Sequence, residues 1–242
     1  MSETGRLMPR RRDKHPAPYW PDYKTSVVRS PSLPLLSMET TPSEESGPRF
    51  GHAMIGPLDN NLILNFSKTG EPAIGERVRV FGRVMDETGR AVPDALIEIW
   101  QANAGGRYRH VKDTYFAPLD PNFGGCGRTI TDADGAYEFM TIRPGAYPWP
   151  NRANDWRPMH IHFSLFGHAF GQRLISQMYF EGDPLIDLCP IAATIEDRSQ
   201  LDRLVAPLDM QNARPMDYLA YRFDIVLRGR RQTMFENKPE GM

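Results

Sequence analysis

The stretch Arg157-Pro158-Met159-His160-Ile161-His162-Phe163 decides how the rest of the chain is interpreted. Apart from its two histidines it is mainly apolar and aromatic, which favours a β-strand. Pro158 stands where a proline can begin a strand without removing a ladder hydrogen bond. Alternate side chains of a strand share a face, so His160 and His162 point the same way, about 6.6 Å apart along the strand. Two such imidazoles can bind one metal ion, but from this stretch alone a pair of histidines on a partly wet sheet face fits equally well.

The composition fits one large all-β domain with extensions, or two small domains, in a chain of 242 residues. The 22 prolines and 20 glycines often separate short β-prone runs, which is more typical of a β protein than of a helical bundle. A net charge of -1 provides no global field for nucleic acid or an acidic membrane. We expect neither a membrane span nor a secretory signal. Two cysteines, Cys126 and Cys189, are too few for a disulfide framework, so we expect a reducing, cytoplasmic setting.

Several β-prone runs are bounded by turn residues and are therefore expected to be strands. These runs cover residues 77–85, 95–101, 137–142, 160–166, 173–180 and 220–228, and residues 62–75 lead into them. At least six strands with turns between them predict an antiparallel β-sandwich. The one helix that the periodicity predicts covers about residues 195–205, where Leu201, Leu204 and Val205 share a face. The predicted fold is thus all-β with little helix.

Residues 1 to about 50 are predicted to form a long irregular arm, because the prolines spread along it exclude long regular elements. The basic run at residues 10–12 is short and Asp13 follows it, which favours a solvated or partner-facing tail over nucleic-acid binding. The arm is nevertheless too apolar to remain in water, so we expect it to pack on the domain or on another subunit. Its apolar side chains include Tyr19, Trp20, Tyr23, Leu33, Leu35 and Leu36. We therefore divide the chain into an arm with its lead-in, residues 1–75, and a sandwich domain, residues 76–242.

The residues alone leave open what completes a metal site around the two histidines. Structural zinc would need cysteines or further histidines, and His110 and His168 lack a supporting spacing. An iron(II) site of two histidines and one carboxylate could use Asp155. Tyr108 and Tyr147 lie in glycine-containing loops at strand ends, where a side chain can point into a site. Either tyrosine taken singly is more often an ordinary core or rim residue.

Several segments together resemble the intradiol ring-cleaving dioxygenases. They are Ala95-Leu-Ile-Glu-Ile-Trp-Gln-Ala-Asn-Ala-Gly-Gly-Arg-Tyr108, Thr131-Asp-Ala-Asp-Gly-Ala-Tyr137, Thr141-Ile-Arg-Pro-Gly-Ala-Tyr147-Pro-Trp149 and Arg157-Pro-Met-His-Ile-His162-Phe. The likeness extends from about residue 20 to residue 236, and two tyrosines with two histidines in this order and context are a specific signal. It implies a transthyretin-like (prealbumin-like) antiparallel sandwich.

By this resemblance, Tyr108, Tyr147, His160 and His162 are the protein ligands of one non-haem iron(III) per chain. Two anionic phenolates would offset two of the three positive charges of the ion. A free tyrosine has a pKa of about 10, but a bound cation removes the proton, as it does from bound water and thiols. The family implies that Tyr147 is the ligand displaced when a catechol binds, and that it accepts one of the catechol's protons.

The resemblance also assigns the remaining site residues. Arg157 would stabilise negative charge beside the metal, and Gln177, Trp149 and Ile191 would line the pocket. Tyr23 in the arm matches the position that contacts a substrate carboxylate, which favours protocatechuate (3,4-dihydroxybenzoate) as the substrate.

The expected reaction opens protocatechuate with O2 to 3-carboxy-cis,cis-muconate, a step of aromatic catabolism in the β-ketoadipate pathway. The partner that the family implies is an α subunit of the same enzyme, which has a similar fold, lacks the iron ligands and completes the active site. Two alternatives remain. One is an intradiol dioxygenase for catechol or hydroxyquinol, and the other is a metal-free, transthyretin-like binding module.

Overall fold

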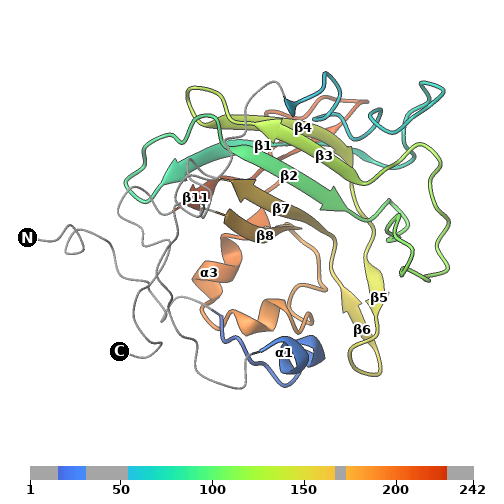
Figure 1. Ribbon diagram of the computed structural model, residues 1–242, viewed down its shortest axis with the longest axis vertical. Coiled ribbons are helices and arrows are strands. Elements are labelled where there is room, and N and C mark those ends of the chain that lie inside the picture. Colours follow the sequence, from blue (N-terminus) through green and yellow to red (C-terminus); the bar gives the residue numbers. More distant parts are fainter. Residues whose placement is uncertain (1–15, 31–53, 167–172, 228–242) are drawn as a thin grey trace, which may run out of the picture.

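The computed structural model describes residues 16–30, 54–166 and 173–227 (Figure 1). The strands are β1 (Arg77–Asp86), β2 (Leu96–Gln101), β3 (Cys126–Ile130), β4 (Ala136–Ile142), β5 (Tyr147–Trp149), β6 (Asp155–Arg157), β7 (His160–Phe166), β8 (Arg173–Phe180), β9 (Val205–Ala206), β10 (Leu219–Arg222) and β11 (Ile225–Leu227). The helical segments are α1 (Lys24–Arg29), the 3-10 turn η4 (Ala192–Thr194) and α3 (Arg198–Asp202). The described part is therefore mostly strand and loop with little helix, as predicted.

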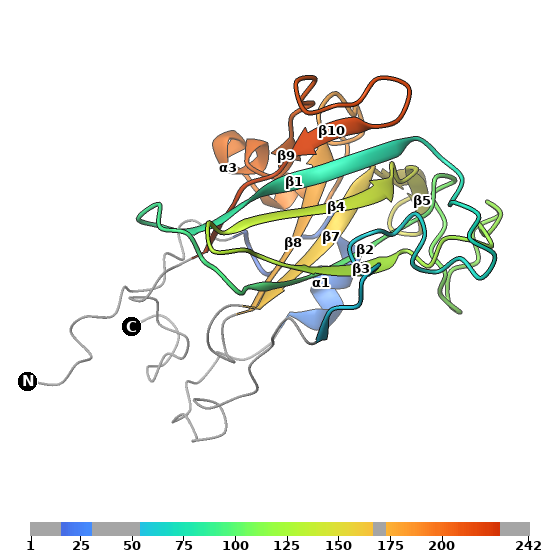
Figure 2. The same cartoon turned by 90° about the horizontal axis from the view of Figure 1, so that it is seen from above.

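The strands form two main sheets and a separate hairpin. One sheet has the order β10-β1-β11 with β4 also paired to β1, and the other has the order β3-β2-β7-β8-β9. The hairpin joins β5 to β6. Figure 2 shows β1 and β4 in one layer, with β2, β3 and β7 in the other. The layers arise because each sheet has one apolar face that must be buried.

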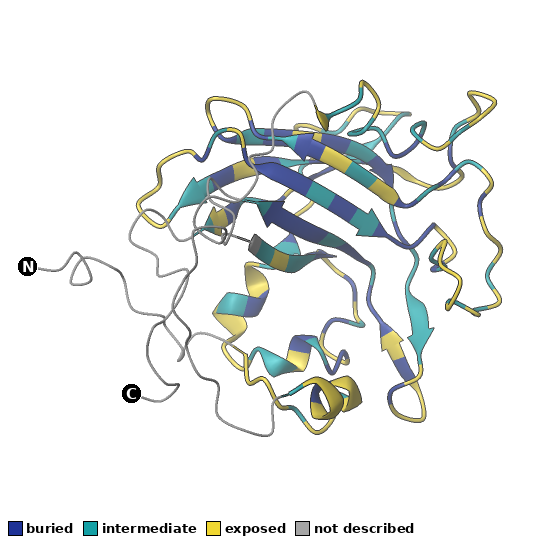
Figure 3. Cartoon of the chain, in the orientation of Figure 1, coloured by how far each residue is buried: buried dark blue, intermediate teal, exposed yellow. Residues whose placement is uncertain are grey.

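The core between these layers consists of side chains that alternate along the strands. Phe163 of β7 lies at its centre, with ring centroids 5.9 Å from Phe139 and 6.3 Å from Tyr137, both on β4. Phe163 and Phe139 are each at most 1% exposed. Full burial of a side chain of this size contributes about 1.5–3 kcal/mol relative to leaving it in water. These ring contacts hold the two sheets face to face, and Figure 3 shows the buried positions along the strands.

The expectation of a purely antiparallel sandwich was wrong in part. The pairs β1–β4, β2–β3, β2–β7 and β7–β8 are antiparallel. However, β1 pairs in parallel with both β10 and β11, and β8 pairs in parallel with β9. The parallel pairs join strands that are distant in the sequence, so no hairpin connects them and no local turn signal could have predicted them.

The predicted strand at residues 220–228 is interrupted at Phe223 and Asp224, which separate β10 from β11. At this break the carbonyl oxygen of Phe223 approaches Gly82 of β1 so closely that an added Cβ would lie 2.0 Å from it. The same carbonyl accepts a hydrogen bond from the Tyr137 hydroxyl at 2.5 Å. These contacts divert the carbonyl from regular strand pairing. Arg228, the last residue of the predicted strand, lies outside the described residues.

The other predicted strands were confirmed, whereas the predicted helix was confirmed only in part. Sequence reasoning missed the short strands β3, β5, β6 and β9, and the lead-in at residues 62–75 consists mainly of turns and bends. The helix predicted at 195–205 is limited to α3, which begins after Asp197, whose carboxylate accepts the Ser199 amide at 3.0 Å. The chain then leaves the helix because the carbonyl of Leu204 accepts the amide of Tyr179 at 2.7 Å. That bond brings Val205 into the sheet as β9.

The described part of the arm packs on the β5–β6 hairpin. The side-chain oxygen of Asn151 accepts the Lys24 amide at 2.9 Å, and its nitrogen donates to the Asp22 carbonyl at 2.6 Å. The turn before the unpredicted helix α1 is closed by Ser26, whose hydroxyl donates to the Trp20 carbonyl at 2.7 Å. Leu33, Leu35 and Leu36 lie outside the described residues. Within the described ranges, no helix has the length and apolar character needed to cross a bilayer.

Candidate functional site

The loop of residues 102–108 after β2 carries Tyr108, and the loop of residues 143–146 after β4 leads to Tyr147 at the start of β5. The two loops touch backbone to backbone. A Cβ on Gly106 would lie 2.2 Å from the carbonyl oxygen of Ala146, and one on Gly145 would lie 2.6 Å from the Gly106 amide nitrogen. Gly106 also has a φ of 81°, a conformation that glycine adopts without strain. The absence of side chains at both positions lets the loops meet, so their tyrosines reach the same point.

Four side chains meet at that point. The hydroxyl oxygen of Tyr108 lies 3.1 Å from Nε2 of His162 and 3.4 Å from Nε2 of His160. The hydroxyl oxygen of Tyr147 lies 3.5 Å from Nε2 of His160. The two histidines share a face of β7, as the strand alternation predicted, and their imidazole centroids are 4.8 Å apart. Two oxygens and two nitrogens from three separate segments are therefore close enough to share one ion.

The orientation of each imidazole is set by the surrounding chain. Nδ1 of His160 lies 2.6 Å from the Pro158 carbonyl oxygen, which can only accept, so Nδ1 carries the proton and donates. Nε2 therefore keeps its lone pair and faces the tyrosines. His162 stacks on Trp100 with centroids 4.7 Å apart and an interplanar angle of 1°. Trp100 is the strand neighbour of His162 in the β2–β7 register.

Burial favours the neutral form of all four groups. It lowers the pKa of His162 to about 4 and holds the pKa of His160 well below its usual value, and the nearby Arg157 adds to both effects. Burial also raises the pKa of Tyr108 and of Tyr147 above the usual value. The site thus offers two neutral nitrogen donors and two phenols that lose a proton only to a strong cation. This donor set fits a hard trivalent ion such as iron(III).

Among the residues that the structure describes, the other ligand sets considered for a metal do not assemble. The Asp155 carboxylate is bound by Arg152 at 2.9 Å and by Asn151 at 2.8 Å, and these bonds lower its pKa to about 2. Its oxygens are therefore already engaged, which argues against the two-histidine, one-carboxylate site. His110 is exposed, and His168 lies outside the described residues. Across the described ranges, no cluster of three His, Cys, Asp or Glu side chains could hold a metal.

Arg157 lies beside this cluster, opposite Tyr147 in the β5–β6 register. Its side chain is 5% exposed, and it donates to the Gln177 side-chain oxygen at 2.5 Å. Nε of Arg157 is buried without a hydrogen-bond partner. None of the ion pairs among the described residues includes it. A buried cation without a carboxylate can stabilise an anion that enters the site.

Gln177 reaches the site from β8, where it is the register neighbour of His162. Its side-chain oxygen also accepts a hydrogen bond from the Tyr179 hydroxyl at 3.2 Å, and Tyr179 is the register neighbour of His160. Burial raises the pKa of Tyr179 to about 12, so it remains a donor. Sequence reasoning did not assign Tyr179 to the site, because its position opposite a histidine follows only from the strand register.

The structure connects the predicted pocket residues to the cluster in different ways. Trp149 lies under the Arg157 guanidinium, with a centroid distance of 5.8 Å. Tyr23 meets Trp149 edge to face with centroids 5.4 Å apart, so the arm reaches the pocket wall. Ile191 packs on a small buried cluster that contains Tyr179. Arg157, Gln177, Trp149 and Tyr23 thus form one chain of contacts, whereas Ile191 packs on the neighbouring cluster that contains Tyr179.

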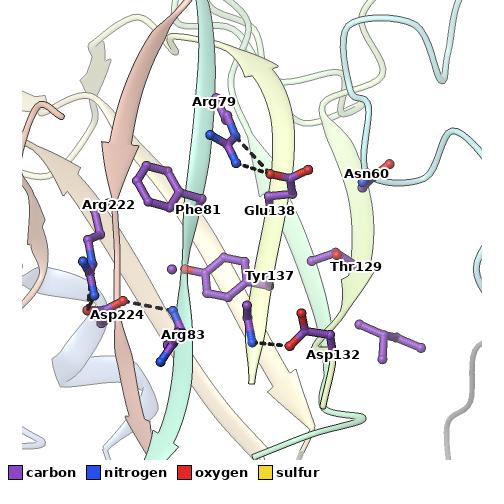
Figure 4. A pocket seen from close by; sticks show the side chains of 13 residues that line it. Asn60, Arg79, Phe81, Arg83, Thr129, Asp132, Tyr137, Glu138, Arg222 and Asp224 are labelled. Atoms are coloured by element: carbon purple, nitrogen blue, oxygen red, sulfur yellow. Dashed lines mark hydrogen bonds and ion pairs between the residues drawn. The ribbon is translucent and has the colours of Figure 1, made fainter. Parts of the chain in front are cut away.

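A separate hollow of about 550 Å³ lies over β1, β4 and β10 (Figure 4). Two of its arginines are paired with carboxylates, Arg79 with Glu138 at 2.5 Å and Arg222 with Asp224 at 2.9 Å. None of the four donor residues lines it. Its charges are therefore largely matched within the hollow, and we assign it no chemistry.

Comparison with known proteins gives independent information on this chain. The family model described as "Dioxygenase" matches residues 45–229, and the one described as "Protocatechuate 3,4-dioxygenase beta subunit N terminal" matches residues 8–41. A protocatechuate 3,4-dioxygenase beta chain from Burkholderia cepacia is 50% identical over 230 residues, which cover 95% of this chain and 97% of the relative. A protocatechuate 3,4-dioxygenase alpha chain from Pseudomonas putida is 31% identical over 211 residues, covering 84% of this chain and 98% of the relative.

Among solved structures, 3-chlorocatechol 1,2-dioxygenase from Rhodococcus opacus is similar with a TM-score of 0.55 and 20% identity. The match covers 85% of this chain and 78% of that chain. At this level of identity the likeness concerns the fold alone.

Proposed function

This chain belongs to the dioxygenase family whose model it matches over residues 45–229, and from that premise we propose that it is the iron-carrying β subunit of a protocatechuate 3,4-dioxygenase. The enzyme would open the ring of protocatechuate with O2 between its two hydroxyl-bearing carbons to yield 3-carboxy-cis,cis-muconate. The observation that carries the proposal is the convergence of Tyr108, Tyr147, His160 and His162 on one point.

These four residues would hold one non-haem iron(III) in each chain. When bound there, the iron would supply the Lewis acidity that makes a chelated catechol reactive towards O2. The imidazoles are already neutral and would bind through Nε2. The two phenols would each release a proton on binding, and their negative charges would offset two of the three charges of the ion. Tyr147 would later accept a proton from the incoming catechol.

The residues around the four donors would bind and orient the substrate. Arg157 is always charged and is held against Gln177, so its guanidinium would stabilise negative charge that develops on the ring. Trp149 supplies an aromatic wall between Arg157 and the arm. Tyr23 would hydrogen-bond the substrate carboxylate, and Ile191 would contact the ring from the side of Tyr179.

The working enzyme would combine this chain with an α subunit of similar fold, and the partner would supply the rest of the carboxylate site. Beta and alpha chains are both among the relatives of this chain, which supports an assembly of two related chains. Within this chain, residues 1–75 would serve as arm and lead-in and residues 76–242 as the catalytic domain. The two facing sheets are in keeping with a transthyretin-like sandwich.

Co-expression with the α subunit of the same source tests this function. The purified complex should show the broad visible absorption of phenolates bound to iron(III), and it should consume O2 with protocatechuate faster than with catechol or hydroxyquinol. This chain alone should aggregate or bind iron poorly. Full activity from a monodisperse solution of this chain alone would refute the proposed partner, and a colourless complex without turnover would refute the function.

Substitution of Tyr147 by phenylalanine should leave iron bound but slow the reaction. Tyr147 is the ligand that the family displaces when a catechol binds, so the other three donors would have to hold the iron without it, whereas neither histidine is displaced. The group that accepts a catechol proton is lost, and general base catalysis of this kind contributes about 10²–10⁴-fold to rate. Iron content and stopped-flow measurement of the catechol-binding step would check this. Tyr115→Phe is a suitable control, since that tyrosine meets Trp156 edge to face outside the cluster. An unchanged binding step would contradict the role of Tyr147.

A further inference from the structure

One peptide group links a buried carboxylate to a histidine of the site. The amide of Met159 donates to Oδ2 of Asp183 at 2.7 Å. The carbonyl of the same peptide group, that of Pro158, accepts from Nδ1 of His160 at 2.6 Å. The order of groups is therefore carboxylate, peptide, imidazole, and the Nε2 atom at the far end faces the tyrosines.

Asp183 is held in place for this contact. It lies in the turn after β8 and is 7% exposed, and its other oxygen, Oδ1, accepts the Leu185 amide at 2.9 Å. No lysine, arginine or histidine of the described residues forms an ion pair with it. Because no side-chain cation neutralises the carboxylate, backbone amides carry its stabilisation. The peptide group next to His160 supplies one of these amides, so the negative charge of the carboxylate polarises it strongly.

The two hydrogen bonds on the peptide group strengthen each other. An anion that accepts from a peptide N–H draws the amide proton towards itself and increases the negative charge on the carbonyl oxygen of the same group. The carbonyl then becomes a better acceptor for the imidazole Nδ1–H. Acceptors of this kind orient a histidine ligand and increase the electron density that it donates to a metal.

We propose that Asp183 is a positioning residue that acts on His160 through the peptide group between Pro158 and Met159. It fixes the plane and tautomer of the imidazole and makes Nε2 a stronger donor to the metal. The inference rests on the proposed function, because it takes His160 to be a metal ligand. It adds a residue that lies on another loop and contacts neither the metal position nor the substrate.

A second aspartate provides a matched control. Asp120 is also 7% exposed, and its two oxygens accept the amides of Asn122 at 2.8 Å and Ile74 at 2.7 Å. Both aspartates thus accept the amide two residues ahead and one distant amide. The two peptide groups that bond the Asp120 carboxylate, however, are not next to any of the four proposed metal ligands. Substitution at both positions separates loss of a buried aspartate in general from loss of the link to His160.

The test uses Asp183→Asn and Asp120→Asn in this chain co-expressed with the α subunit. Asparagine keeps the shape but loses the charge, and its NH2 group cannot accept one of the two amides. We measure the rate of iron loss to a chelator, the visible absorption maximum, and thermal unfolding of the metal-free complex. Asp183→Asn should lose iron about 10-fold faster than the parent, since outer hydrogen-bond partners of metal ligands typically contribute 10–100-fold.

The absorption maximum of Asp183→Asn should also move to longer wavelength, because a weaker imidazole donor leaves a more electron-poor iron that draws charge from the phenolates more easily. Asp120→Asn should keep the parental rate and maximum even where it lowers thermal stability. Asp183→Glu, which retains the charge, should lie closer to the parent than Asp183→Asn does.

Three outcomes would overturn the proposal. Asp183→Asn could show the parental rate and maximum, or both asparagine variants could lose iron equally fast. The third outcome is that Asp183→Asn and Asp183→Ser both fail to fold while Asp120→Asn folds. Asp183 would then be needed for folding only. A parent complex that binds no iron would instead refute the proposed function, and the inference with it.

Discussion

Substitution of His160 by alanine should remove most of the iron, and the visible colour and the activity should be lost with it. His160 is 2% exposed, and its Nε2 lies within 3.5 Å of both tyrosine hydroxyls, so it stands at the centre of the donor cluster. Loss of an outer partner of a ligand already weakens metal binding about 10–100-fold. Loss of the ligand itself should therefore weaken it by more than about 100-fold.

Elemental analysis and the visible spectrum of the purified complex would measure this effect. His162→Ala should behave in the same way, with an additional loss of the stacking contact to Trp100. His110→Ala is the matched control, because that histidine is exposed and its Nδ1 only accepts a backbone amide at 3.2 Å. If either variant in the cluster retained full iron and full activity, the assignment of the ligands would be wrong.

Arg157→Lys should lower kcat by about 10²–10³, the size of effect seen when an oriented donor to developing negative charge is removed. Lysine keeps the charge, but it cannot reproduce the planar guanidinium that donates to Gln177 and lies over Trp149. Arg157→Ala should be at least as slow. Iron content should not change in either variant, since Arg157 is not one of the four donors.

Steady-state kinetics with protocatechuate and iron analysis would separate this effect from metal loss. A suitable control is Arg152→Lys in the same hairpin, because Arg152 is 46% exposed and pairs with Asp155 away from the donors. If the complex carrying Arg157→Lys turned over at the parental rate, Arg157 would be a structural residue. If the iron content fell while the turnover per bound iron stayed at the parental value, Arg157 would support the metal site and not the reaction.

Local sequence signals predicted those parts of the fold in which neighbouring residues decide the structure. The strand containing His160 and His162 is one example, because its alternation and the preceding proline act within a few residues. The short strands β5 and β6 carry Tyr147 and Arg157 but were not predicted. Strands of three residues have no periodicity to detect, and they form here because they pair with each other.

The motifs alone were enough to predict the kind of chemistry, since two tyrosines and two histidines in their contexts resembled one family. They could not determine how those residues meet. Tyr108 and Tyr147 reach the histidines only because two loops touch at Gly106 and Gly145, which are far apart in the chain.

The three-dimensional packing was needed to find Tyr179 opposite His160 and Asp183 on the neighbouring Met159 amide. Their positions depend on the register of β7 against β8 and on the turn that follows, and both are settled by packing across the core. The same holds for the parallel pairing of β9, β10 and β11. A local pattern specifies which face of the sheet a side chain occupies. Which residue lies next to it on that face depends on the strand register, which is set by the burial of apolar side chains over the whole sheet.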